Sequence, residues 1–193
     1  ALENSALKWS ADHLRHHART DQEEDPYNAT KGFWYSHCGW ILFRDPYTHE
    51  KYEAPFRTDR WVMWQHRYYL PIVMLGLVLP FLIGFIHGGL RGGVGCFLLA
   101  GIGRIFVVLN STFCINSLCH LWGDQPNGDD NGSRDSIWVS LITFGEGYHN
   151  YHHAYPRDFR NGAKLYNFDS SKWLIFGLSK IGLAHHLVRE TPV

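Results

Sequence analysis

The sequence predicts an all-α protein: an integral membrane helical hairpin with a cytoplasmic helical cap that carries histidine motifs. Two observations lead to this fold class. Two apolar stretches, residues 69–86 and 94–119, are each long enough to cross a bilayer as a helix. The pattern His-x-x-His-His occurs before them, at residues 13–17, and after them, at residues 149–153. We expect one domain over residues 1–193, made of a cytoplasmic part (1–68), two transmembrane spans (69–119) and a second cytoplasmic part (120–193).

The histidine pattern at residues 13–17 is typical of a metal site on a helix. Residues i, i+3 and i+4 share one helical face, so three imidazoles point at one small volume. Residues 149–153 repeat the spacing, and six imidazoles exceed what one four-coordinate zinc ion needs. Neutral imidazole suits iron, zinc, copper or nickel. The two copies therefore predict a site for two metal ions, with the candidate ligands His13, His16, His17, His149, His152 and His153.

The two apolar stretches have the flanks of membrane spans. Residues 69–86 carry no formal charge and follow Trp61, Trp64 and Arg67, which form an aromatic and basic collar. A glycine-rich turn separates them from the second stretch, where Arg104 is the only charged residue. The alternative is a soluble protein that buries the same hairpin in its core.

Two spans return the chain to the side that it left, so both histidine patterns are expected in one compartment. Three arginines precede the first span between residues 57 and 67, whereas the turn holds only Arg91, which favours the cytoplasm. His120 ends the second apolar stretch on this same side, and Asn116 shares its helical face one turn earlier. The sequence thus adds a seventh imidazole and a polar group that could hold a metal-bound water.

Composition excludes other classes of protein. The 18 basic residues balance the 18 acidic ones, so there is no basic surface for nucleic acid. The four cysteines form no C-x-x-C pair, which argues against a zinc ribbon or a disulfide framework.

Three motifs together resemble the membrane acyl-CoA desaturases, the stearoyl-CoA desaturase family. They are Asp12-His-Leu-Arg-His-His17, Asn116-Ser-Leu-Cys-His120 and Gly145-Glu-Gly-Tyr-His149-Asn-Tyr-His152-His153, and the resemblance covers nearly the whole chain. It implies a non-haem di-iron centre that uses O₂ to place a cis double bond, most often at the delta-nine position, in a saturated fatty acyl chain during fatty acid biosynthesis. The acyl carrier would be coenzyme A or a lipid. Because the sequence has no G-x-G-x-x-G nucleotide fingerprint, an external ferredoxin or cytochrome b5 would supply electrons.

The resemblance also implies roles by position. The iron ligands would be His13, His16, His17, His120, His149, His152 and His153. Asn116 matches the residue that positions a metal-bound water. The substrate residues would be Trp9 and Thr112 in the acyl tunnel and Arg44 near the headgroup. Asp12 and Glu146 are candidate carboxylates that orient imidazoles, with helix capping or turn formation as the alternative.

The sequence also differs from the family pattern, and these differences lead to further predictions. The family's upstream His-x-x-x-x-His box is absent, which predicts an N-terminally truncated chain that binds iron poorly and is inactive by itself. Ala11 and Asp45 stand where animal members have Arg and Lys, so positive charge is missing where coenzyme A phosphates would bind. These changes favour a bacterial origin and leave the acyl carrier open.

Two alternative functions remain. A di-iron membrane hydroxylase or ketolase of lipids would use the same type of centre and diverge only after the first hydrogen abstraction. A histidine-rich membrane metal carrier would place its ligands within the spans, whereas only Asn116 and His120 approach one here. The remaining histidines are expected to be surface or interfacial polar groups: His37, His49, His66, His87, His185 and His186.

Overall fold

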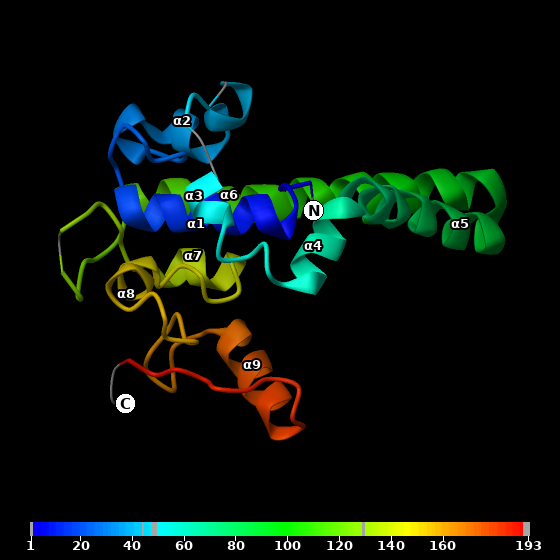
Figure 1. The fold of residues 1–193 in the computed structure, drawn as a ribbon. Helices are drawn as coiled ribbons and strands as arrows, with labels where there is room; N and C mark the ends of the chain where they lie inside the picture. Colours follow the sequence, from blue (N-terminus) through cyan, green and yellow to red (C-terminus); the bar gives the residue numbers. More distant parts are fainter. Residues whose placement is uncertain (1, 44, 48–49, 129, 191–193) are drawn as a thin grey trace. The chain divides into compact units, whose positions relative to one another are not determined.

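The computed structural model confirms the all-α class. It describes residues 2–43, 45–47, 50–128 and 130–190, and within these ranges it contains helices, turns and isolated bridges but no β-strand (Figure 1). The chain divides into two compact units, Ala1–Ala18 with Asp45–Asn110 and Arg19–Arg44 with Ser111–Val193. Helix α6 (Arg104–Leu121) contributes to both, and each unit is described by itself.

The first unit begins with α1 (Ala6–Arg19), which presents one apolar face with the buried Leu7 and Ala11. Ser5 caps its start, because its hydroxyl oxygen accepts from the backbone N–H of Lys8 at 3.4 Å. The same hydroxyl lies 2.7 Å from Nδ1 of His66 in α4 (Arg60–Arg67). The short α3 (Glu50–Glu53) also belongs to this unit. These contacts fix the start of the first histidine helix against α4.

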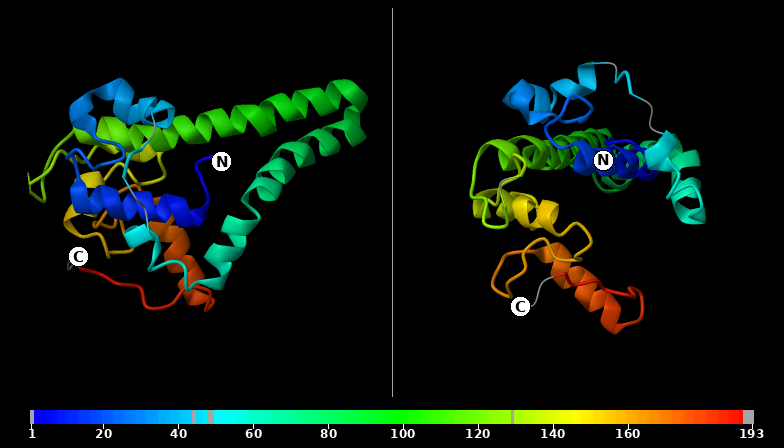
Figure 2. Two further views of the ribbon diagram at one scale, coloured as in Figure 1. Left: turned by 45° about the horizontal axis from the view of Figure 1, so that its top comes forward. Right: turned by 60° about the vertical axis from the view of Figure 1, so that its left-hand side comes forward.

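A glycine pair reverses the chain after the first apolar stretch. Helix α5 (Tyr69–Cys96) is interrupted at Gly88 and at Gly89, where φ of +58° and ψ of −153° suit only glycine. A π-helical segment, η3 (Phe97–Gly103), then leads into α6. The arms before and after the reversal meet at the turn and diverge away from it (Figure 2). A Cβ added at Gly84 would lie 2.7 Å from the Cβ and Sγ of Cys96 and collide with the Gly92 carbonyl.

The close approach at Gly84 predicts a specific packing defect. Gly84→Ala should destabilise the paired arms by about 1–3 kcal/mol, because a backbone carbonyl has to move to admit the methyl group. Gly95→Ala is the matched control, since nothing lies within 4 Å of its added Cβ. Thermal unfolding in one detergent measures both. Equal midpoints for the two variants would contradict this packing.

The paired arms expose an apolar surface. The helical stretch Tyr69–Leu121 is long and apolar enough to cross a membrane, and only 6% of its most apolar window is buried. Ile86, Leu99 and Phe106 are each at least two-thirds exposed. A buried hairpin in a soluble core would cover such side chains, so the exposure favours contact with lipid. Passage through a membrane as two spans stays a prediction.

The second unit packs short helices around the end of α6. These elements are η1 (Ala29–Lys31), α2 (Phe33–His37), η2 (Gly39–Leu42), α7 (Ile137–Ile142), α8 (His149–Ala154) and α9 (Ser170–Lys180). Phe113 on α6 is buried and meets the rings of His37 and Trp40 edge-on, at 5.8 and 6.0 Å between centroids. The expectation of a surface histidine was wrong at His37: its Nδ1 lies 3.0 Å from the Ser117 hydroxyl, which satisfies it in the core.

Candidate metal centre

Three histidines of the second unit converge on one point. His120 ends α6, and His149 and His153 lie on one face of α8. Nε2 of His149 is 3.1 Å from Nε2 of His120 and 3.1 Å from Nε2 of His153. Ring nitrogens of all three lie within 4.8 Å of one another, and the side chains of His120 and His149 are buried.

The chemistry of this cluster favours a cation. A ring nitrogen directs either one lone pair or one N–H along a single line, so one nitrogen cannot form two good hydrogen bonds with two neighbours. A metal ion at the common point would accept all three lone pairs. The cluster can therefore hold a metal as a partial ligand set of neutral imidazoles.

The segment before α7 holds the first turn of α8, which carries His149. Oδ1 of Asp135 accepts from the backbone N–H groups of Asn150 and Tyr151, at 2.8 and 3.1 Å, and so caps the helix beside His149. The side chain of Asn150 is buried and donates to the carbonyls of Gly128 and Ser133. Together these bonds tie the first turn of α8 to the segment that precedes α7.

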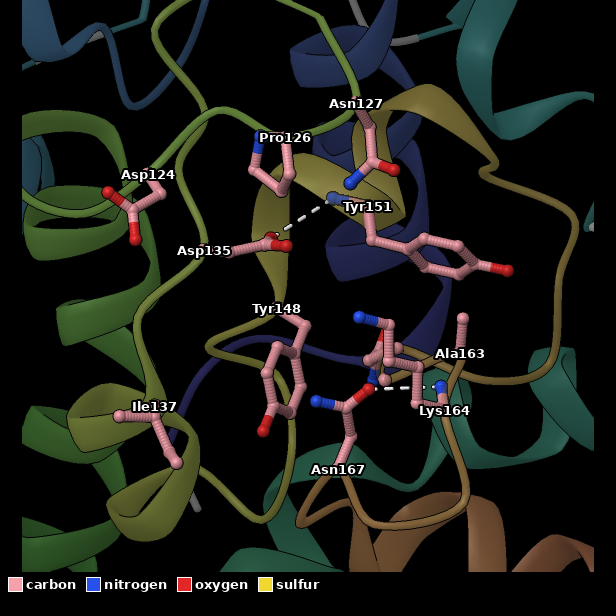
Figure 3. A pocket seen from close by; sticks show the side chains of 12 residues that line it. Asp124, Pro126, Asn127, Asp135, Ile137, Tyr148, Tyr151, Ala163, Lys164 and Asn167 are labelled. Carbon is pink, nitrogen blue, oxygen red and sulfur yellow. Dashed lines mark hydrogen bonds between the residues drawn. The ribbon is translucent and has the colours of Figure 1, made fainter. Parts of the chain in front are cut away.

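A cavity of about 570 Å³ lies beside α8 (Figure 3). It is lined by Asp124, Pro126, Asn127, Asp135, Ile137, Tyr148, Tyr151, Asn161, Gly162, Ala163, Lys164 and Asn167. Burial, with a smaller contribution from Asp124, raises the pKa of Asp135 to about 6, although the N–H groups of Tyr151 and Asn150 lower it. The described residues that line this cavity include no histidine, so it is distinct from the cluster.

The three histidines of the first motif are neighbours on α1. The rings of His13 and His17 are 4.6 Å apart, and those of His16 and His17 are 5.9 Å apart. Trp9 stacks on His13 at 5.1 Å with an angle of 8° between the rings. The helical spacing therefore brings the three imidazoles of this motif together, as the sequence predicts.

The remaining predicted residues occupy varied positions. His152 stacks on His149 at 5.7 Å but does not share the point where His120 and His153 converge. Asn116 and Thr112 lie on α6 and are partly exposed. Asp12 lies 3.7 Å from the buried guanidinium of Arg15, which also pairs with Asp45. Arg44 lies outside the described residues.

Sequence reasoning missed two polar neighbours of the cluster. Oδ1 of Asp21 is 3.5 Å from Nδ1 of His120, and the hydroxyl of Thr20 is 3.5 Å from Nδ1 of His153. The available signal was a Thr-Asp pair that directly follows the first histidine helix.

Glu146 is partly buried, and its described neighbours include Asn161 and Asp169. Burial, with a smaller contribution from Asp169, raises the pKa of Glu146 to about 7, and a hydrogen bond with Asn161 lowers it. Asp169 caps α9 and also accepts from the N–H groups of Asn161 and Gly162. Glu146 thus faces the segment that leads into α9, and its role in orienting an imidazole stays a prediction.

The raised pKa of Glu146 predicts a pH-dependent stability. The folded protein retains a proton that the unfolded chain loses above about pH 4.3, so this contribution is full at lower pH and is lost as the pH rises through about 7. Glu146→Gln mimics the protonated form, and at pH 8 it should be more stable than wild type by up to about 3 kcal/mol. Unfolding midpoints between pH 5 and 8 test this, with the exposed Glu24→Gln as control. Parallel curves for Glu146→Gln and wild type would refute it.

Comparison with known proteins adds an independent observation. Residues 2–175 match the family model "Fatty acid desaturase". Over 97% of its length the chain is 44% identical to a probable acyl-CoA desaturase of Schizosaccharomyces pombe and 42% identical to acyl-CoA desaturase 1 of Saccharomyces cerevisiae. Over its whole length it is 36% identical to the sn-2 palmitoyl-lipid 9-desaturase of Nostoc sp. (strain 36), of which it covers 67%. The chain spans only 39% and 37% of the two yeast proteins.

Proposed function

The chain belongs to the fatty acid desaturase family, and we propose that the protein introduces a cis double bond into a saturated fatty acyl chain in a reaction that consumes O₂. One observation carries the proposal beyond family membership. The ring nitrogens of His120, His149 and His153, from segments far apart in the sequence, converge on one buried point.

The donor set fits iron. Every candidate ligand is an imidazole, and oxygen atoms of Asp21 and Thr20 lie beside the Nδ1 atoms of two of them, as around metal-bound histidines. Two irons would be held by His13, His16, His17, His120, His149, His152 and His153. With O₂, iron supplies an oxidant strong enough for an unactivated methylene group, which acids and bases of side chains cannot attack. Asn116, one turn before His120, would hold a water molecule beside the centre.

The reaction balances with an external reductant. Two hydrogens leave neighbouring methylene groups of the acyl chain, and two electrons and two protons arrive from outside. Together they reduce O₂ to two water molecules. We assign the electrons to a one-electron carrier of the ferredoxin or cytochrome b5 type.

The exposed apolar arms support a site beside a membrane. In this proposal α5 and α6 cross the bilayer as two spans, and both histidine motifs lie on the cytoplasmic side. Relatives are named for acyl-CoA and for a palmitoyl lipid, so the acyl chain is the shared substrate. We propose the delta-nine position for the double bond, Trp9 and Thr112 as tunnel residues, and Arg44 as a headgroup residue.

Analysis of acyl chains tests the reaction. The full-length gene should be expressed in a host that lacks its own delta-nine desaturase, and the position of new double bonds should be determined by gas chromatography and mass spectrometry. We expect cis monounsaturated chains that disappear in His152→Ala. Hydroxylated chains would assign the protein to the lipid hydroxylases instead. An unchanged profile, with the protein present in the membrane, would contradict the proposal.

A further inference from the structure

The segment that directly follows α1 places two oxygen atoms behind the histidine cluster. Asp21 lies against Nδ1 of His120, and Thr20 lies against Nδ1 of His153, each at 3.5 Å. Both histidines direct the opposite ring atom, Nε2, toward His149. An acceptor at Nδ1 retains the proton there and leaves the Nε2 lone pair available. Thr20 and Asp21 thus give the two nitrogens of each ring different roles: Nδ1 keeps the proton, and Nε2 offers its lone pair.

Hydrogen bonds to Asp25 and from Gly132 hold the Asp21 carboxylate in this place. Asp21 has φ of +60°, in the left-handed region, which Asp and Asn adopt more readily than other non-glycine residues. Its N–H donates to Oδ2 of Asp25 at 2.8 Å, and its own Oδ2 accepts from the N–H of Gly132 at 2.7 Å. A Cβ on Gly132 would collide with that oxygen. The Asp21 carboxylate therefore joins the segment that follows α1 to the loop that contains Gly132.

We propose that Asp21 is a positioning residue for the metal centre: it fixes the tautomer and orientation of His120 and raises the basicity of its Nε2. Thr20 does the same, more weakly, for His153. This inference rests on the proposed function, because it assigns these residues a role toward the metal. Asp21 has one oxygen for Gly132 and one for His120, so the carboxylate serves the loop and the imidazole at the same time.

Replacing Asp21 by asparagine separates its contact with Gly132 from its contact with His120. Asn has one acceptor oxygen where Asp has two, and Asn also tolerates the left-handed conformation. In Asp21→Asn the oxygen can still accept from Gly132, whereas the NH₂ group then faces His120. That NH₂ group favours a lone pair on Nδ1 and the proton on Nε2, the atom that should bind metal. The fold should survive while metal affinity falls.

Iron affinity and the spectrum of the bound iron test the inference in the full-length protein. We expect Asp21→Asn to lose iron to a competing chelator at an about 10- to 100-fold lower chelator concentration than wild type. The Mössbauer spectrum of the remaining iron should change, while the unfolding midpoint of the metal-free protein stays close to wild type. Glu24→Gln is the matched control, because it makes the same chemical change on the exposed side of the same loop.

A second variant tests the inference even if Asp21→Asn does not fold. Gly132→Ala leaves Asp21 in the sequence but pushes on its carboxylate, so it should reproduce the loss of iron, whereas Gly177→Ala, with open space around its added Cβ, should not. Wild-type affinity and spectrum in Asp21→Asn would overturn the inference and leave the proposed function intact; if Asp21→Asn does not fold, wild-type iron binding in Gly132→Ala overturns it equally. Wild-type protein that binds no iron would overturn the proposed function itself.

Discussion

His149→Ala is expected to abolish desaturation and to reduce the iron affinity of the full-length protein by more than about 100-fold. His149 is the middle member of the cluster: its Nε2 lies 3.1 Å from the Nε2 atoms of both His120 and His153. Its removal takes away a ligand and also breaks the geometry that links α6 to α8. Iron content after gel filtration, and double bonds formed in a desaturase-deficient host, measure the two effects.

Other histidines serve as controls for that loss. His185 is exposed and lies outside the motifs, so His185→Ala should retain both iron and activity. His37→Ala should lower stability, because it removes a buried ring that contacts Ser117 and Phe113, and yet retain iron when folded. Iron binding by His149→Ala at the wild-type level would show that the cluster is not a metal site.

Asp158→Ala is expected to cost the largest amount of stability, about 3–5 kcal/mol, which corresponds to roughly 10 °C in the unfolding midpoint. Nε and Nη2 of Arg160 donate to the two oxygens of Asp158 at 2.9 and 2.7 Å, and the Tyr151 hydroxyl donates at 2.8 Å. Both charged residues are buried, so the variant would leave the Arg160 guanidinium in the interior without this carboxylate. Because Tyr151 belongs to α8, iron affinity should fall as well.

The contribution of Asp158 to stability should depend on pH in a predictable direction. Burial alone would raise the pKa of Asp158, but hydrogen bonds from Arg160, Glu190 and Tyr151 hold it well below its usual range. Its contribution is therefore complete at neutral pH and is lost only as the pH falls below about 4. Glu24→Ala removes an exposed pair with Arg19 and should change stability by less than about 1 kcal/mol at pH 7. Similar unfolding midpoints for Asp158→Ala and Glu24→Ala at pH 7 would contradict a large contribution of the buried Asp158–Arg160 pair to stability.

Periodicity and composition predicted the parts of this molecule that depend on local sequence. The helical spacing of each histidine motif, the apolar stretches and the glycine-rich reversal all follow from neighbouring residues. The structure places the reversal at Gly88 and Gly89, inside the predicted turn. On α8, however, His153 converges with His120 and His149, and His152 does not. His152 and His153 follow His149 by three and four residues, and these two positions lie on opposite sides of His149 on the helix surface.

The contacts that sequence reasoning missed join distant segments. Asp21, with its positive φ, meets His120 at the end of α6 and Gly132 in the following loop, and no periodic pattern predicts contacts between segments so distant in sequence. His37 lies outside both histidine motifs and was expected to be a surface or interfacial polar group, yet it packs against α6. Glu146 is next to the second motif in sequence, but its side chain bonds to Asn161 and interacts with Asp169 and Cys119.

The metal content of the full-length protein tests the central proposal most directly. Purification without added metal, followed by mass spectrometry of the metals and Mössbauer spectroscopy, should find about two high-spin, nitrogen-coordinated irons per protein molecule. Zinc in place of iron, or no bound metal in folded protein, would contradict an iron centre built from His120, His149, His153 and their partners.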